Sequence, residues 1–304
     1  MYEFRKEALD LGGDSDACRS ARGTPQDFPI QTSVVRIRPT TRWSWIDWRE
    51  MWEYRDLLRS LAVRDLKLRY RQTALGILWV VFQPVAGAGV FTLVFGWVAG
   101  LKTPGDSYFL KAMSGLLIWN AFQSTLGKAS MALLGNAALV SKVYFPRLLL
   151  PLSTVLSSLV DFGIGLTALI LVGLCTGWHP VWSDLIGLPL WLALALGSSL
   201  GAGLLAASFM TRYRDVQHVL PMLLPYLMYL SPVGYAVSAA PEQWRKWFEW
   251  NPVAWMLEGS RAALIGGPPV PWEWACYAAL TSLVLLTCGI SFFRQMERSF
   301  ADVH

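Results

Sequence analysis

Charge is scarce in this chain of 304 residues, because Asp, Glu, Lys and Arg make up only 15% of it, against 54% hydrophobic residues. An ordinary soluble domain contains about 25% charged residues, so this composition argues against one. Cysteine and histidine are scarcer still, with four and three residues. The cysteines have no metal-ligand spacing, and the histidines fall on separate predicted loops. These absences favour unpaired cysteines and argue against a metal site or a clustered catalytic site.

A phosphate-binding loop of the form GxxxxGK[ST] is also missing. Gly127–Lys128 is followed by an alanine, and no glycine precedes it at the required distance. Such a loop holds nucleotide phosphates through its backbone N–H groups. We therefore expect no cofactor in this chain, and any work done with ATP must come through a partner that binds ATP and Mg²⁺.

Long apolar segments, by contrast, are abundant. Residues 74–100 contain no charged side chain over 27 positions, more than the ~20 residues that a helix needs to cross a bilayer. The second segment is the shortest, with 16 uncharged residues, and is expected to continue toward Leu134. We predict an all-α integral membrane protein with six transmembrane helices, at residues 74–100, 112–127, 148–174, 185–210, 219–238 and 274–293.

The distribution of Lys and Arg orients these helices. With the N-terminus inside the cell, 21 of the 26 cationic residues fall on the cytoplasmic side. Seven of them lie in the loops 127–147 and 211–218 and in the C-terminal tail. Because cytoplasmic loops are enriched in Lys and Arg, both termini are predicted to be cytoplasmic. The net charge of +5 therefore reflects topology, and we expect no binding of nucleic acid.

Four regions of different character follow along the chain. Residues 1–40 lack apolar periodicity and are predicted to be a disordered cytoplasmic tail. Residues 41–73 combine a helix that has tryptophans on one face, typical of the membrane interface, with a basic segment. A helix packed on the protein's own surface is the alternative. Residues 74–293 form the transmembrane domain, and 294–304 a cytoplasmic tail.

The predicted outer loop 241–267 is too charged to span a bilayer, yet it is rich in aromatic residues. Asn251–Pro252 divides it into two short amphipathic pieces. They are predicted to be two re-entrant helices that form an outer gate, with an interfacial aromatic anchor as the alternative. The gate residues would be Trp244, Trp247, Phe248, Trp255 and Met256.

Four segments, residues 64–84, 136–153, 211–221 and 251–266, together resemble the type-2 ABC exporter permeases that move bacterial surface polysaccharide, the O-antigen (Wzm-like) and teichoic-acid branch. The similarity runs from Trp45 to the C-terminus. It implies a homodimeric permease of the bacterial inner membrane that works with two separate ATPase subunits and exports a lipid-linked glycan. The permease itself would not be an enzyme. An exporter of a drug or lipid with the same architecture stays the alternative.

The short inner loop after the second span is the first candidate for the ATPase contact, since its apolar centre is flanked by cations. The position also matches the coupling helix of the family. An ordinary positively charged loop is the alternative. The candidate residues are Asn136, Leu139, Val140, Lys142 and Arg147, with Arg212 and Arg214 of the next inner loop as a weaker pair.

A second candidate site is the basic cluster just before the first span, Arg64, Lys67, Arg69 and Arg71. Each cation at a membrane surface attracts anionic headgroups by about 1 kcal/mol, so topology alone can explain the cluster. The same side chains could receive the diphosphate of a polyprenyl-linked glycan as it enters, because Arg forms forked hydrogen bonds to phosphate. Both explanations stay open.

Aromatic residues within the spans are candidates for the wall of a glycan channel, because rigid rings stack on sugar faces. For each single ring, packing in the core or against lipid is the alternative. The candidates are Trp79, Phe82, Trp119, Asn120, Phe122, Tyr226, Tyr229 and Tyr235. Asp161 is the only acidic residue well inside a span, and a structural hydrogen bond is favoured over a proton relay. The GxxxG pattern at Gly197–Gly201 permits close packing, within one chain or between two.

Overall fold

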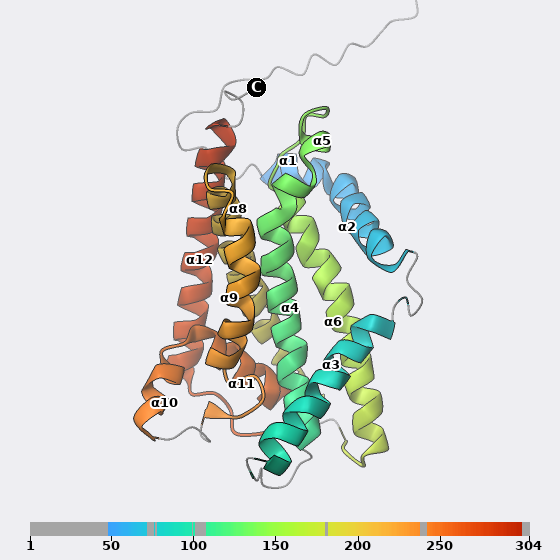
Figure 1. Ribbon diagram of the computed structural model, residues 1–304, viewed down its shortest axis with the longest axis vertical. Coiled ribbons are helices and arrows are strands. Elements are labelled where there is room, and N and C mark those ends of the chain that lie inside the picture. Colours follow the sequence, from blue (N-terminus) through green and yellow to red (C-terminus); the bar gives the residue numbers. More distant parts are fainter. Residues whose placement is uncertain are drawn as a thin grey trace, which may run out of the picture. The chain divides into compact units, whose positions relative to one another are not determined.

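The computed structural model describes residues 48–71, 76, 78–98, 100, 108–179, 182–237 and 242–299. The chain divides into two units, Met1–Ile46 and Asp47–His304, and everything below concerns the second. The predicted tail 1–40 and Trp45 lie outside the described residues. Those that are described form helices and connecting turns without a strand among them (Figure 1). The predicted all-α class is confirmed for this part of the chain.

Four helical segments within the described ranges are long and apolar enough to cross a membrane: Leu78–Val98, Leu149–Cys175, Leu188–Arg212 and Trp272–Met296. The first consists of α3 (Leu78–Phe91) and a π-helical turn, η1 (Thr92–Val98). The others are α6 (Leu149–Cys175), α8 (Leu188–Arg212) and α12 (Trp272–Ser299). Each lies where the charge gaps predicted a span.

The two other predicted spans correspond to helices of a different kind. The helix α4 (Tyr108–Gly135) has 28 residues and would be about 42 Å long, but it contains no 18-residue stretch as apolar as those of the four candidates. The helix α9 (Val216–Leu230) has 15 residues, or about 22 Å, and is too short to cross a ~30 Å hydrocarbon core alone. The sequence predicted a span of 219–238 here, but the helix ends at Leu230 because Ser231–Pro232 breaks it.

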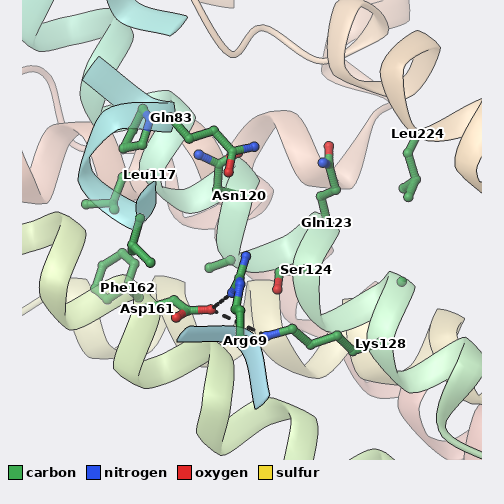
Figure 2. A pocket seen from close by; sticks show the side chains of 14 residues that line it. Arg69, Gln83, Leu117, Asn120, Gln123, Ser124, Lys128, Asp161, Phe162 and Leu224 are labelled. Carbon is green, nitrogen blue, oxygen red and sulfur yellow. Dashed lines mark hydrogen bonds and ion pairs between the residues drawn. The ribbon is translucent and has the colours of Figure 1, made fainter. Parts of the chain in front are cut away.

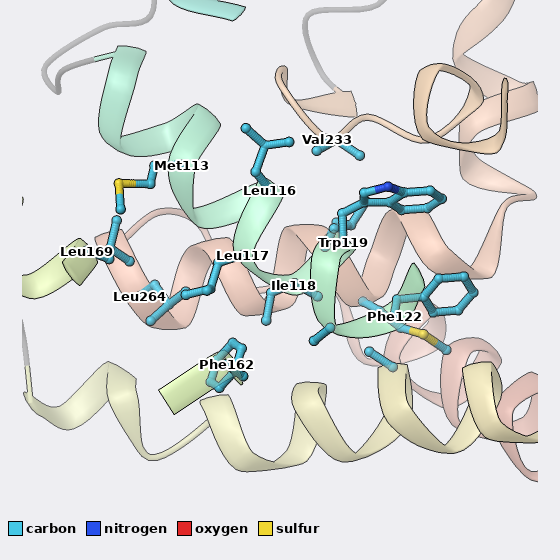
Figure 3. Packing of buried hydrophobic residues seen from close by; sticks show 14 of the residues in the cluster. Met113, Leu116, Leu117, Ile118, Trp119, Phe122, Phe162, Leu169, Val233 and Leu264 are labelled. Carbon is cyan, nitrogen blue, oxygen red and sulfur yellow. The ribbon is translucent and has the colours of Figure 1, made fainter. Parts of the chain in front are cut away.

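The core of the unit is built around α4, which contacts α8, α6, α3 and α11. Sixteen of its 28 residues are buried, and they face in every direction around the helix. Small residues such as Ala112, Ser114 and Gly115 let the neighbouring backbones approach. Figure 3 shows Met113, Leu116, Ile118 and Trp119 of α4 in the main apolar cluster. Because α4 lies at the centre of the bundle, other helices surround it on almost every side.

Close packing of α8 against α12 depends on glycine. A Cβ atom added to Gly201 would lie 2.5 Å from the Leu285 backbone, and one added to Gly289 would lie 2.3 Å from the Gly201 carbonyl oxygen. The GxxxG pattern at Gly197–Gly201 therefore serves packing within this chain, one of the two alternatives that the sequence left open. Small residues of this kind allow the dispersion contacts that hold helices together in a membrane.

One end of the bundle carries α1 (Trp48–Glu53), the start of α2 (Arg55–Tyr70) and α5 (Ala137–Val140) (Figure 1). We call it the α5 end. A small apolar cluster there joins Leu61 of α2 to Phe145, Leu149 and Leu150 at the start of α6. Because Leu61 is buried and α2 runs along α6, this helix packs on the protein's own surface. Trp52 of α1, on the tryptophan face of the predicted interface helix, is 70% exposed, so the interface helix stays a prediction.

The opposite end carries α10 (Glu242–Glu249) and α11 (Pro252–Ile265), and we call it the α11 end (Figure 1). The helix break falls at Asn251–Pro252, where the sequence predicted it. Asn251 caps α11 by accepting a hydrogen bond from Val253 N at 3.0 Å. The short α7 (Trp182–Leu185) contacts α11 at this end. Two helices are thus present in the outer-loop segment, and α11 packs into the bundle against α4, α8 and α12.

A buried arginine on α11 holds the irregular segment 231–237 that follows α9. Arg261 donates to the carbonyl oxygens of Pro232 at 2.9 Å, Val233 at 2.8 Å and Tyr235 at 3.1 Å. Glu258 pairs with Arg261 at 3.3 Å and accepts from Val237 N at 2.6 Å. Backbone groups that leave a helix inside a membrane protein need such partners, and α11 supplies them to the end of α9.

Candidate functional site

An ion-pair cluster joins three helices near the middle of α6. Arg69, in the last turn of α2, pairs through Nη1 with Oδ2 of Asp161 on α6. Lys128 of α4 lies 3.4 Å from the same oxygen and donates to Ser157 Oγ at 3.1 Å. The prediction that Asp161 has a hydrogen-bonded partner is confirmed. One carboxylate faces two cations here, so the cluster keeps an excess of positive charge.

The three charged groups are exposed to different degrees. The side chain of Asp161 is 13% exposed, that of Lys128 29% and that of Arg69 42%. A carboxylate as buried as Asp161 needs partners to offset its lost hydration, and the two cations supply them. Arg69 is the most accessible member and lies on the shortest of the three helices.

A cavity of about 330 Å³ lies beside the cluster, between α2, α3, α4, α6 and α9. Figure 2 shows Asp161 joined by dashed lines to Arg69 and Lys128, with Asn120 and Gln83 further along the wall. Gln123 Oε1 accepts a hydrogen bond from Trp119 Nε1 at 2.8 Å. The NH2 group of Gln123 is then the part of this amide that can donate to another partner. The polar lining consists of Arg69, Lys128, Asp161, Gln83, Asn120, Gln123 and Ser124.

A second cavity of about 410 Å³ adjoins the first along α3 and shares Arg69, Val80 and Gln83 with it. Its aromatic lining is the pair Trp79 and Phe82, whose ring centroids are 5.6 Å apart in an edge-to-face arrangement. Arg69 therefore lies where the two cavities meet. A polar recess and an aromatic recess thus have part of their lining in common.

The four predicted entrance cations have different surroundings. Arg69 lies in the cluster just described, and Lys67 and Arg71 are exposed. Arg64 donates through Nη2 to Asn136 Oδ1 at 2.6 Å and pairs with Asp65 at 3.1 Å. The structure thus links one predicted entrance residue to one predicted coupling residue. Arg64 and Arg69 are carried by the same helix.

The predicted coupling loop is found at the α5 end. Asn136 precedes α5, and Leu139 and Val140 are half-buried against the small apolar cluster under α2. Lys142 is exposed and Arg147 is half-buried. Ala137, Ala138, Val143 and Tyr144 are the exposed apolar side chains of this loop, with Val143 53% and Tyr144 68% exposed. Sequence reasoning missed Val143 and Tyr144, although both lie within the loop that it singled out.

The second inner loop offers less apolar surface. Arg212, at the end of α8, and Arg214, in the turn before α9, are both exposed. The guanidinium of Arg212 lies 5.7 Å from the centre of the Tyr213 ring. The structure therefore leaves this pair accessible at the α5 end but gives it no apolar loop of its own.

The predicted channel residues divide into two groups. Trp79, Phe82, Tyr226 and Tyr229 are exposed, on α3 and α9. Trp119 and Phe122, by contrast, are stacked on each other in the core, with ring centroids 5.5 Å apart and Trp119 only 1% exposed. For these two rings the structure favours packing over lining, because α4 is enclosed by protein. Asn120 lines the first cavity.

Tyr235 lies apart from both groups, in the irregular segment after α9. Its hydroxyl donates to the Tyr229 carbonyl oxygen at 3.4 Å, and its ring contacts Phe248 of α10 edge-on, with centroids 5.8 Å apart. The tyrosine thus connects a predicted channel segment to a predicted gate helix.

The predicted gate residues are also placed differently from one another. Trp244 and Trp247 of α10 are exposed, whereas Met256 of α11 is fully buried. Trp255 stacks on Trp274 of α12 with ring centroids 4.8 Å apart, and its Nε1 donates to the Glu249 carbonyl oxygen at 2.8 Å. Met256 packs in the core and cannot present a surface to a channel in this arrangement, so the exposed rings among the five predicted gate residues are Trp244 and Trp247 of α10.

Lys128 is the functional candidate that sequence reasoning overlooked. The charge gaps used it only as the limit of a span, because a lysine normally marks the end of one. In the structure α4 continues to Gly135, and Lys128 lies within the helix beside Asp161. The signal available in the sequence was an intramembrane acid, Asp161, that required a cation on a neighbouring helix.

Comparison with known proteins adds the family. Residues 56–265 match the model of the ABC-2 type transporter family. The O-antigen export system permease protein RfbA of Myxococcus xanthus is 29% identical over 84% of this chain and 97% of its own length. RfbA of Klebsiella pneumoniae is 27% identical over 82% and 95%, and the polysialic acid transport protein KpsM of Escherichia coli is 24% identical over 80% and 94%. The matched region spans α2 to α11 and contains both cavities, so this chain belongs to the ABC-2 type transporter family.

Proposed function

We propose that the chain is the permease subunit of an ATP-driven exporter that carries a lipid-linked polysaccharide across the bacterial inner membrane. The observation that carries the proposal is the similarity, over at least 80% of this chain, to permeases named for O-antigen and polysialic acid transport. These relatives favour a glycan over the drug or lipid alternative. The positive, amide-lined cavity and its aromatic neighbour suit a phosphorylated and hydroxyl-rich substrate.

The proposed topology has six spans with both termini in the cytoplasm. The four apolar helices supply four crossings, and α4 and the α9 segment supply the second and fifth. In support, the cationic inner loops gather at the α5 end, and α10 and α11 lie at the opposite end (Figure 1). The α11 end would then face the periplasm, where α10 would act as the exposed part of a gate.

The proposed partners are a second copy of this chain and two ATPase subunits that bind ATP and Mg²⁺. Exposed aromatic residues on α3 and α9 would face the pathway of the dimer, where Trp79, Phe82, Tyr226 and Tyr229 would contact sugar rings. The exposed part of the α5 loop would dock the ATPase through Val143 and Tyr144. An apolar contact with a cationic rim is typical of a docking surface of this kind.

The test is to co-express the chain with its cognate ATPase and to measure surface glycan in cells. The isolated permease should hydrolyse no ATP, and the co-expressed proteins should purify as a complex of two copies of each. Deletion of the permease should abolish surface glycan while lipid-linked glycan accumulates inside the cell. Surface glycan at the normal level in the deletion strain would contradict the proposal.

A further inference from the structure

The ion-pair cluster contains one more cation than anion, and this imbalance faces a cavity. Arg69 and Lys128 both contact Oδ2 of Asp161. Among the residues that line the cavity, Asp161 is the only acid. Two cations from different helices that meet at a single oxygen occupy the positions that an anion would need, and the carboxylate is the anion that now lies there.

The remaining polar lining consists of neutral groups that can donate hydrogen bonds. Gln83, Asn120 and Gln123 carry amide NH2 groups, and Ser124 carries a hydroxyl. A volume of about 330 Å³ is at the lower end of the range for small-molecule sites, about 300–1,000 Å³. Cations beside neutral donors fit a compact, highly charged acceptor such as a phosphate or diphosphate.

We propose that this cavity binds the diphosphate group of the lipid-linked substrate and that Asp161 occupies the anion position when no substrate is bound. The inference rests on the proposed function and adds Lys128 and Asp161 to the site. An incoming diphosphate exchanges partners with Asp161, so that Arg69 and Lys128 turn from the carboxylate to the phosphate oxygens. A diphosphate displaces a carboxylate because it carries more negative charge and more acceptor oxygens.

The location of the cluster supports this exchange. Arg69 is 42% exposed and lies where the two cavities meet, so a ligand reaches it first. Lys128, on the central helix α4, donates a hydrogen bond to Ser157 Oγ at 3.1 Å and is less exposed than Arg69. The wall beyond Arg69 carries Trp79 and Phe82, which can contact the first sugar or the lipid while the diphosphate is bound.

The experiment measures binding of farnesyl diphosphate, a short polyprenyl diphosphate, to the complex of full-length permease and ATPase in nanodiscs of phosphatidylcholine. Asp161→Asn removes the competing charge and should bind farnesyl diphosphate about tenfold more tightly than the wild type. Lys128→Gln should bind it about tenfold more weakly, and Lys128→Arg should recover most of the loss. Unchanged affinity in both Asp161→Asn and Lys128→Gln would overturn the proposal.

Glu258→Gln is the matched control. Glu258 is also partly buried and also pairs with an arginine, Arg261 at 3.3 Å, but it does not line the cavity. This variant changes the net charge by the same amount and should leave the affinity within about twofold of the wild type. An equal gain in Glu258→Gln and Asp161→Asn would show a general charge effect and overturn the assignment to this cavity.

Folding is measured alongside binding, as the yield of assembled complex and its melting temperature. Where Asp161→Asn lowers that yield, Asp161→Ser makes the same test with a smaller neutral side chain. Asp161→Glu keeps the charge and should bind as the wild type does. Weaker binding in a well-assembled Asp161→Ser complex would show that the carboxylate helps to hold the ligand, contrary to the proposal.

Two further arms identify the source of the phosphate. Inorganic diphosphate should bind more weakly than farnesyl diphosphate but rank the variants in the same order. Phosphatidylglycerol in the nanodiscs should not reproduce that order; if it alone does, the cavity is a site for membrane headgroups and the assignment to substrate is wrong. The binding experiment and the glycan test have separate outcomes. A deletion strain that keeps its surface glycan would contradict the proposed function even if farnesyl diphosphate binds as expected.

Discussion

The central helix α4 and the flanking helices α3 and α9 are alike in sequence and different in position. All three are apolar and carry aromatic residues, yet Trp119 of α4 is 1% exposed, whereas Trp79 of α3 is 50% and Tyr229 of α9 is 61% exposed. Lipid is about as apolar as a protein core, so hydrophobicity does not separate the two environments. The small and hydroxyl-bearing residues of α4, among them Ala112, Ser114 and Thr125, are the better sign of burial.

Replacing a ring by alanine tests this comparison most strongly. Trp119→Ala should cost about 3–5 kcal/mol of stability, because the indole loses contacts on all sides in the core. Trp79→Ala, on the exposed face, should leave the yield of folded protein unchanged and reduce glycan export. Thermal melting in detergent and surface glycan are measured for both. Equal losses of yield would show that the two rings are in the same environment.

Two glycines in long helices make the next comparison. Gly201→Ala places a Cβ atom 2.5 Å from the backbone of α12 and should cost about 1–3 kcal/mol through the forced separation of α8 and α12. Gly163→Ala on α6 meets no atom within 4 Å in this chain and should be neutral or stabilising by up to about 1 kcal/mol. The melting temperatures of the two variants should therefore move in opposite directions or differ clearly. Similar shifts would argue against the close α8–α12 contact.

Substitutions of two arginines in the basic segment should differ in their effect on stability by less than the two glycine substitutions do. Arg64→Gln loses the hydrogen bond to Asn136 and should cost about 1 kcal/mol. Arg71→Gln changes an exposed side chain and should stay within about 0.5 kcal/mol of the wild type. Chemical unfolding monitored by tryptophan fluorescence would detect the difference. A larger loss for Arg71→Gln than for Arg64→Gln would contradict the assignment of Arg64 as half-buried and hydrogen-bonded and of Arg71 as exposed.

The smallest effect on stability is expected at the α5 end. Val143→Ser with Tyr144→Ser changes two exposed side chains and should alter stability by less than about 0.5 kcal/mol while weakening co-purification with the ATPase. Leu139→Ser, in the half-buried part of the same loop, should lower stability as well as docking. If the ATPase still co-purifies at the wild-type level with the double variant, the docking surface lies elsewhere, with Arg212 and Arg214 as the next candidates.

Much of the fold could be predicted because it depends on local chemistry. Charge gaps located the four apolar helices, and Asn251–Pro252 located the break between α10 and α11, since Asn caps a helix and Pro suits its first turn. The early end of α9 was not predicted, because Ser231–Pro232 sits in a segment that stays apolar to residue 238. The pattern of apolar residues does not predict where a helix ends when the backbone groups beyond that end are hydrogen-bonded by a side chain of another helix.

The candidate site was predicted only in its parts. Arg69 and Asp161 were each singled out, but 92 positions separate them in the chain, and nothing in the sequence pairs them with each other or with Lys128. Likewise Trp79 and Trp119 could not be told apart, since the distinction depends on which helices surround them. A single sequence shows which residues are charged or aromatic. Which distant residues contact one another depends on how the helices pack.

The contacts of Arg261 have a consequence for the order in which the protein is made. Pro232 and Val233 leave the ribosome well before Arg261, which follows them by 29 and 28 residues and donates to both carbonyl oxygens. Until α11 is synthesised, the end of α9 has no such donor, and a bare carbonyl in hydrocarbon costs several kcal/mol. The end of α9 therefore reaches its final hydrogen bonding only once α11 is in place. We therefore expect a chain cut between α9 and α11 to leave this end of α9 incompletely folded.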